Sequence, residues 1–314
     1  MQITPNVLMN TLLSNVQTQE QRLYQLQEEV STGQAFQIPS DNPSAVTNTM
    51  ALNDTLASVK SYLSSATSAK SILNETNGVL QNVVQLTQSA YALATQAANS
   101  TLNGSDITAM QETVKTDLSS LAQLLNTQYQ GTYILGGTNN TTPPLDITSS
   151  SVTWNPGATG SQNQEFQLGS DQFVTANITG AESGLVATTS SPPSPFNAFL
   201  QLYQNLQGLE QTLSSGSAGV NVSAIEASAQ SLSGDLGNMT TLQSIVGARM
   251  RRVQNAQTQL NSLSLNLNQS IAQYSSADMA SVTIQLAQEE QAYQATLQSG
   301  AQILPLSLLN FIKP

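Results

Sequence analysis

The sequence predicts a mainly α protein, an elongated antiparallel coiled-coil or helical-bundle rod with a small β-rich insertion domain. Apolar residues recur every three or four positions near both ends of the chain, and the longest such stripe runs from Ile225 to Tyr274. Between residues 130 and 191 the pattern changes to short alternating runs separated by prolines and glycines. The stripes near both chain ends, the longest one included, are typical of packed helices. The alternating runs are typical of strands and turns.

The stripe from Ile225 to Tyr274 alternates steps of four and three residues, and only Gln243, Gln257 and Ser264 interrupt it. A period of 3.5 held over this length indicates a helix that supercoils against partner helices, because on a straight helix the stripe would drift around the surface. We therefore expect one long helix here. Together with a shorter helix before it, this helix forms the C-terminal half of the rod, residues 192–274.

The first helix is expected within residues 1–42, where a second stripe is apolar at six of its seven positions. One helix with such a narrow stripe is marginal until a partner helix covers it. We expect this helix to pair with the C-terminus of the chain during assembly and to contribute to a subunit interface. The apolar members of the stripe are Met9, Leu12, Val16, Leu23, Leu26 and Val30.

A hinge is predicted after the first helix, at Gly33, Pro39, Asp41, Asn42 and Pro43. Glycine suits the position just past a helix end, and a proline disfavours the helical conformation of the residue before it. Asp41 or Asn42 is suited to cap a helix whose first residue is Pro43. The connector therefore separates two long helices.

Residues 43–129 are expected to form two antiparallel helices, the N-terminal half of the rod, joined by a turn at residues 99–104. The stripe of the first of these helices includes the polar Lys70 and Asn77, and the second helix has Asp106 near its positive end. The β-rich outward domain, residues 130–191, follows. About sixty residues make a thin core, so we expect this domain to pack on the helices or on neighbouring molecules.

Residues 275–314 are expected to form an amphipathic helix whose stripe restarts at Met279 and stops before Pro305. The apolar tail beyond Pro305 has one suitable partner within the chain, the first helix. We therefore expect the C-terminal segment to contribute to the same subunit interface. Its candidate interface residues are Leu286, Tyr293, Leu297, Leu308, Leu309 and Phe311.

The composition favours packing of many copies over binding of nucleic acid or membrane. Only 9% of the residues are charged, and the net charge is −11. An acidic chain offers no electrostatic footprint for phosphate backbones or anionic lipid, and no apolar run is long enough to span a bilayer. A polar surface built mainly from Gln, Asn, Ser and Thr permits close lateral contact between copies, which charged surfaces oppose.

The chain has no His and no Cys, so it lacks the side chains that most often act as bases, nucleophiles or zinc ligands. The adjacent pairs Glu28–Glu29 and Glu289–Glu290 point in different directions on a helix and are typical of solvated faces. The sequence therefore predicts a protein that is not an enzyme, with no catalytic residues, no cofactor and no metal site.

Three of the eight basic residues, Arg249, Arg251 and Arg252, lie within four positions of one another. They either form a solvated helix face beside the apolar stripe, or bind carboxylates or carbonyls of another segment or another copy. Gly247 and Ala248 favour the second interpretation, because small residues permit close approach of a backbone. We include the three arginines among the candidate interface residues.

Four motifs resemble the flagellin superfamily of bacteria. They are Val30-Ser31-Thr32-Gly33, Ile38-Pro39-Ser40-Asp41-Asn42-Pro43, Gly247-Ala248-Arg249-Met250 and Leu306-Ser307-Leu308-Leu309-Asn310-Phe311. The resemblance covers both ends of the chain, roughly residues 1–135 and 225–314. Within the superfamily, Ser-Thr-Gly followed by Pro-Ser-Asp-Asn-Pro is most similar to the proteins at the junction of the flagellar hook and filament.

The resemblance implies a structural adaptor that is exported through the flagellar type III apparatus and lies outside the cell at the hook-filament boundary. The implied partners are the first hook-associated protein, flagellin, further copies of the chain in one layer, and an export chaperone. Paired terminal helices would line the central channel. Two alternatives remain: flagellin itself, and a secreted coiled-coil adhesin or effector.

Overall fold

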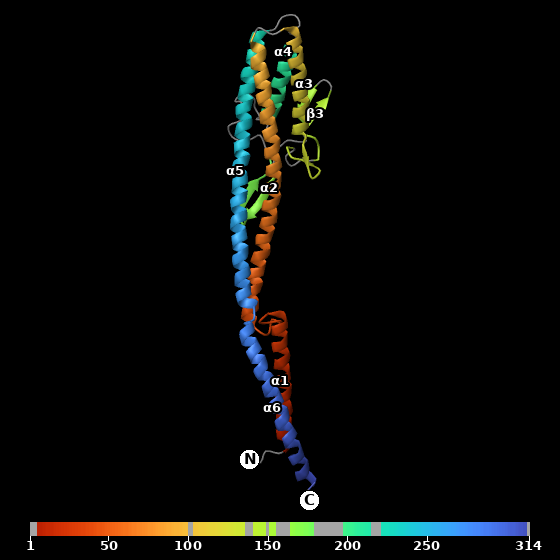
Figure 1. The fold of residues 1–314 in the computed structure, drawn as a ribbon, viewed down its shortest axis with the longest axis vertical. Helices are drawn as coiled ribbons and strands as arrows, with labels where there is room; N and C mark the ends of the chain where they lie inside the picture. Colours follow the sequence, from red (N-terminus) through yellow and green to blue (C-terminus); the bar gives the residue numbers. More distant parts are fainter. Residues whose placement is uncertain are drawn as a thin grey trace. The chain divides into compact units, whose positions relative to one another are not determined.

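The computed structural model describes residues 5–99, 103–135, 141–148, 151–154, 164–178, 197–214 and 221–312. Long helices make up most of this part of the chain, and short strands follow the third helix (Figure 1). The prediction of a mainly α fold with a small β-rich insertion is confirmed. The helices are α1 Pro5–Thr32, α2 Pro43–Ala98, α3 Gly104–Leu125, α4 Asn197–Ser214, α5 Val222–Ser275 and α6 Met279–Ile312.

The chain divides into two compact units. Unit 1 comprises Met1–Ser58 and Leu263–Pro314, and unit 2 comprises Val59–Ser262. Unit 1 therefore holds α1 and α6 with the adjoining ends of α2 and α5. Unit 2 holds the remainder of α2 and α5, together with α3, α4 and the strands.

Within unit 2, α2 and α5 run antiparallel and are joined by polar side chains. Lys70 Nζ donates to Gln254 Oε1 at 2.6 Å, and Gln257 Nε2 donates to Thr67 Oγ1 at 3.3 Å. A step of three residues back along α2 thus matches a step of three forward along α5. Lys70 and Gln257 are two of the polar residues that interrupt the apolar stripes. Each forms a hydrogen bond to the other helix, near the apolar contact between α2 and α5.

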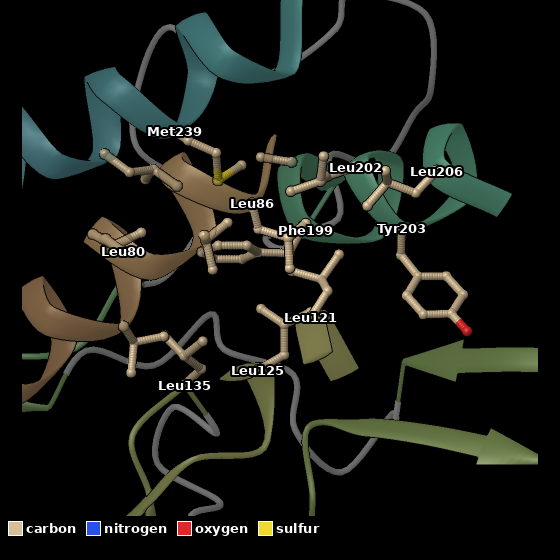
Figure 2. Packing of buried hydrophobic residues seen from close by; sticks show 14 of the residues in the cluster. Leu80, Leu86, Leu121, Leu125, Leu135, Phe199, Leu202, Tyr203, Leu206 and Met239 are labelled. Atoms are coloured by element: carbon tan, nitrogen blue, oxygen red, sulfur yellow. The ribbon is translucent and has the colours of Figure 1, made fainter. Parts of the chain in front are cut away.

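The hydrophobic core of unit 2 draws side chains from all four of its helices. Figure 2 shows Phe199 of α4 among leucines of α2, α3 and α4, with Met239 of α5 above it. Complete burial of a side chain of this size stabilises the fold by about 1.5–3 kcal/mol. The largest fully buried side chains include Leu73, Leu80, Leu121, Leu125, Phe199, Leu202, Leu206 and Leu209.

A capping box fixes the start of α3. The side chain of Asn103 accepts a hydrogen bond from the Asp106 amide at 3.0 Å, and Asp106 Oδ2 accepts one from the Asn103 amide at 3.2 Å. Two amides that the helix leaves without partners are thereby satisfied. The expected role of Asp106 at the positive helix end is consistent with this arrangement.

The strands form three separate antiparallel hairpins, β1–β2, β3–β4 and β5–β6, within the described residues. Leu135, Leu145, Leu168, Val174 and Ile178 are buried in the same cluster as the helical core, so the insertion does pack on the helices, as expected. The strand bounds are β1 Gln128–Tyr129, β2 Thr132–Tyr133, β3 Leu145–Thr148, β4 Ser151–Trp154, β5 Glu165–Gly169 and β6 Gln172–Thr175.

The C-terminal helix passes through a proline. Residues 275–314 are expected to form one amphipathic helix, and α6 runs from Met279 through Pro305 to Ile312. A proline lacks the amide hydrogen that a helix interior uses, and its ring displaces the carbonyl one turn earlier. Both effects are local, so the helix continues on both sides of Pro305 although the apolar stripe ends before it. No helix among the described residues is both long and apolar enough to span a membrane.

A buried acid, Asp235 of α5, faces α4. Its side chain is 2% exposed, and Asn205 Nδ2 donates to its Oδ2 at 2.7 Å. Burial raises the pKa of Asp235 to about 6, although the hydrogen bond from Asn205 opposes that rise. The pair places polar groups inside an apolar contact between two helices, where they favour one register over others.

We predict that Asp235 makes the protein less stable as pH rises. Its pKa is higher in the folded chain than in the unfolded chain, so its favourable contribution is complete below about pH 4 and is lost as pH passes about 6. Asp235→Asn keeps an acceptor for Asn205 and removes the charge. Urea denaturation should show the variant to be more stable than the parent at pH 8 by about 1–3 kcal/mol, with a much smaller difference at pH 4. An equal difference at both pH values would contradict the prediction.

Candidate subunit interface and hinge

Helices α1 and α6 form an antiparallel pair within unit 1, with both chain ends at the same end of the pair (Figure 1). Gly300 of α6 lies against Leu12 of α1: a Cβ placed on Gly300 would be 2.7 Å from Leu12 Cδ2. At the opposite end of the pair, Gln34 forms an antiparallel bridge with Ser276. The small residue at position 300 thus permits a close approach of the two helices.

The pair buries its apolar stripe only in part. Met9 is 36% exposed and Leu297 is 47% exposed, and no described side chain of α1 or α6 belongs to the hydrophobic core cluster. Leu308, Leu309 and Phe311 lie within α6, but their side chains are outside the described part of the structure. The other candidate interface residues are half-buried, namely Leu12, Val16, Leu23, Leu26, Val30, Leu286 and Tyr293.

Unit 1 carries nearly all of the uncovered apolar side chains of the described chain. Of the fourteen exposed large hydrophobic residues, twelve lie in unit 1, which is the smaller unit. They include Tyr24 at 66%, Met50 at 63% and Ile284 at 60% exposed. In unit 2 the two are Tyr91 and Phe173. Exposed apolar residues concentrated in this way mark an interaction surface.

The predicted hinge lies beside a second break in the chain. Two hydrogen bonds tie them together: the Ala35 amide donates to the Ser275 carbonyl at 2.8 Å, and the Ala277 amide donates to the Gly33 carbonyl at 2.9 Å. Gly33 has a φ of +69°, a backbone conformation that residues with a Cβ adopt only at a cost. The connector between α1 and α2 is therefore fixed to the connector between α5 and α6.

The two polar hinge residues have different partners. Asn42 Oδ1 accepts from the Ala45 amide at 3.0 Å and caps α2, which begins at Pro43. Asp41 Oδ2 accepts instead from the Gln37 and Ile38 amides, at 3.3 and 3.2 Å, and so holds the turn that contains Pro39. Burial, and to a smaller extent the nearby Asp41 carboxylate, raises the pKa of Glu29 at the end of α1.

Sequence reasoning missed the cap at the second break. Asp278 Oδ1 accepts from the Ala280 and Ser281 amides at 3.1 and 3.3 Å, which is the usual role of an aspartate just before a helix. Its position immediately before Met279, where the apolar stripe restarts, was the available signal. The bridge to Gln34 had no such signal, because it joins residues far apart in the chain.

The arginine cluster is divided between two environments. Arg249 Nη1 donates to the backbone carbonyl of Asn177 at 2.7 Å, so this arginine binds a carbonyl of another segment of its own chain. Asn177 is fully buried, and its Oδ1 accepts from the Gln164 amide at 2.8 Å. Arg251 and Arg252 are exposed and form no ion pair with any described residue. Nothing in the sequence marked Asn177 as the partner of Arg249.

Comparison with known proteins gives matches of two kinds. Residues 3–140 match the family model of the bacterial flagellin N-terminal helical region. The chain is 22% identical over 321 residues to flagellar hook-associated protein 3 of Salmonella typhimurium, covering 98% of both chains. It is 22% identical over 299 residues to flagellar hook-associated protein 3 of Escherichia coli, covering 91% of this chain and 92% of that protein.

A solved structure shares the fold. A putative flagellar hook-associated protein from Vibrio parahaemolyticus superposes with a TM-score of 0.64 and 16% identity, covering 75% of this chain and all of that chain. These matches confirm the resemblance to the flagellin superfamily that the terminal motifs indicated.

We predict that Gly33→Ala loosens the bridge between the two breaks. A residue with a Cβ at a φ of +69° is destabilised by roughly 1–2 kcal/mol, so the amides of Ala35 and Ala277 should exchange about five- to thirty-fold faster with solvent deuterium. Gly78→Ala in the middle of α2 is the control, because its φ is not positive and an added Cβ meets open space. Unchanged exchange at both amides in Gly33→Ala would contradict the role assigned to the bridge.

We predict that Gly300→Leu disrupts the pairing of α1 with α6. The added side chain overlaps Leu12, and overpacking of this kind costs about 1–3 kcal/mol. Hydrogen exchange in α1 around Leu12 should accelerate about ten-fold. Ala301→Leu adds bulk at the neighbouring, exposed position of the same helix and should leave exchange in α1 unchanged. Equal effects of the two variants would show that the close approach at Gly300 is unimportant.

Proposed function

Because the chain is a relative of the hook-associated proteins of the flagellin superfamily, we propose that it is a structural adaptor subunit that joins the flagellar hook to the flagellin filament. One observation supports this function above all others. The helix pair formed by α1 and α6 leaves much of its apolar surface uncovered within a single chain, whereas unit 2 is well packed. A subunit of this kind completes its packing only when other subunits surround its terminal helices.

The exposed apolar surface indicates what the terminal helices need. A lone pair of helices covers one face of each, and the remaining faces of α1 and α6 carry Leu13, Tyr24 and Ile284 into solvent. Neighbouring copies in one layer would cover these faces. We propose that the first hook-associated protein contacts the layer on the hook side and that flagellin contacts it on the filament side.

The same surface supports export before assembly. Uncovered apolar helices are prone to aggregate inside the cell, so we propose that an export chaperone holds the amphipathic C-terminal segment until the chain is exported. The proposed location is outside the cell, at the boundary of hook and filament. The role is structural, and we assign no catalytic residue.

We predict that Ile284→Asp abolishes assembly without unfolding the chain. Ile284 is 60% exposed, so a charge there should change the free energy of unfolding by no more than about 0.5 kcal/mol. A charge buried between neighbouring subunits would be far more costly. Gln285→Asp adds the same charge at the next exposed position of α6 and is the matched control.

The test is complementation of a strain that lacks the gene, followed by electron microscopy of flagella labelled with an antibody against the chain. The parent and Gln285→Asp chains should restore motility and give label only at the hook-filament boundary, and Ile284→Asp should do neither. Label along the whole filament would identify the chain as flagellin. Label away from the flagellum would indicate a secreted adhesin or effector and overturn the proposal.

A further inference from the structure

A groove of about 440 Å³ lies between α5 and the β5–β6 hairpin in unit 2. On the hairpin side, its wall is Gln172 of β6. The wall on α5 repeats at helical spacing and consists of Ala248, Arg251, Arg252, Asn255, Ala256 and Gln259. This face is different from the apolar seam of the same helix, which holds the buried Val246, Val253 and Leu260.

The polar side chains of the groove all carry N–H donors. Two guanidinium groups and three side-chain amides line it, and no carboxylate does. Asp171, which precedes Gln172, is not among the lining residues and forms no ion pair with Arg251 or Arg252. In a chain with a net charge of −11, the groove is therefore a local basic surface without an acidic partner among the described residues.

The hairpin wall is held in place by the first arginine of the cluster. Arg249 donates to the carbonyl of Asn177, shortly after β6, and so ties the end of the hairpin to α5. The guanidinium of Arg251 lies along the helix over Gly247, with Nη1 3.9 Å from the place where a Cβ would stand. Arg249 thus builds the groove, while Arg251 and Arg252 remain available to a ligand.

Exposure decides which kind of ligand the groove suits. Arginine charges in contact with water are screened, and an exposed ion pair contributes only about 0–1 kcal/mol, so a small anion would be held weakly. A protein surface that covers the groove excludes water and allows bidentate hydrogen bonds between guanidinium and carboxylate groups. Nucleic acid is disfavoured by the overall negative charge of the chain.

We propose that this groove binds a carboxylate-bearing segment of a second copy of the chain. Nineteen acidic residues against eight basic ones mean that copies of the chain repel one another on average, and also that each copy offers many carboxylates. A basic groove on every copy turns that repulsion into attraction at one defined place. The proposal rests on one part of the proposed function, namely that copies of the chain lie side by side in one layer.

The test uses purified full-length chain as an equal mixture of unlabelled and ¹⁵N-labelled protein. A photoreactive benzoylphenylalanine replaces Gln259 in the groove or, as the control, the exposed neighbouring Thr258, which does not line it. We expect cross-links that join labelled to unlabelled chains from position 259, at least ten-fold more than from position 258. Mass spectrometry should place them on peptides that contain Asp or Glu.

A charge reversal then tests the two arginines. Arg251→Glu with Arg252→Glu should lower the yield of mixed-isotope cross-links from position 259 at least ten-fold. Lys60→Glu with Lys115→Glu changes the net charge by the same amount at exposed lysines of α2 and α3, and should lower the yield much less. Circular dichroism should show unchanged unfolding midpoints for both double variants, because all four residues are exposed.

Three results would overturn the proposal. They are the absence of mixed-isotope cross-links at millimolar chain concentration, equal yields from positions 258 and 259, and an equal loss in the two double variants. The measurement is made on purified protein, whereas the proposed function is tested by the position of the label on flagella. A chain found at the hook-filament boundary whose groove gives no cross-link would therefore refute this inference alone.

Discussion

The coverage of narrow apolar stripes on long helices is the constraint on which the rest of the structure depends. A stripe with a period of 3.5 residues buries little surface by itself, so each helix needs a neighbour along its whole length. In unit 2 that need is met within the chain: α3, α4 and the hairpins cover α2 and α5, and Leu73, Leu80 and Leu232 are completely buried. In unit 1 one helix covers one helix, and among the described side chains of α6 the large apolar one that is buried is Val282, at 6% exposed. The difference between the units is thus a difference in the number of partners, not in the kind of stripe.

Polar residues in and beside the stripes set the register that the apolar residues leave undetermined. Leucine and valine pack almost equally well after a shift of one heptad, but a hydrogen bond across the helix pair does not survive such a shift. Lys70 with Gln254, Gln257 with Thr67, and Asp235 with Asn205 all join different helices in this way. The small number of charged residues makes these contacts more selective, because few alternative partners exist along the helices.

The sequence was sufficient to predict what depends on neighbouring residues. Periodicity located the helices of the described residues, and Gly33, Asn42 and Pro43 located the hinge, because helix ends are decided by residues within one turn. Contacts between distant segments could not be predicted in the same way. The bridge from Gln34 to Ser276 and the bond from Arg249 to Asn177 depend on which segments lie side by side, and no local pattern encodes that. Which interface residues contact another subunit stays a prediction, since their half-buried positions show only that one chain does not cover them.

The bridge between the two breaks also explains how a pair of marginal helices keeps its register. The chain leaves α1 and enters α6 at the same end of the pair, so the pair is connected to α2 and α5 through two separate connectors at that end. If each connector bent independently, α1 could slide along α6, and the contact of Leu12 with Gly300 would be lost. The hydrogen bonds from Ala35 to Ser275 and from Ala277 to Gly33 make the two connectors one element, because a bend in either must be matched by the other. Register at the bridge then fixes register along the whole pair, since helices are stiff over this length. The left-handed glycine at position 33 is therefore a determinant of side-chain contacts that lie several helical turns away.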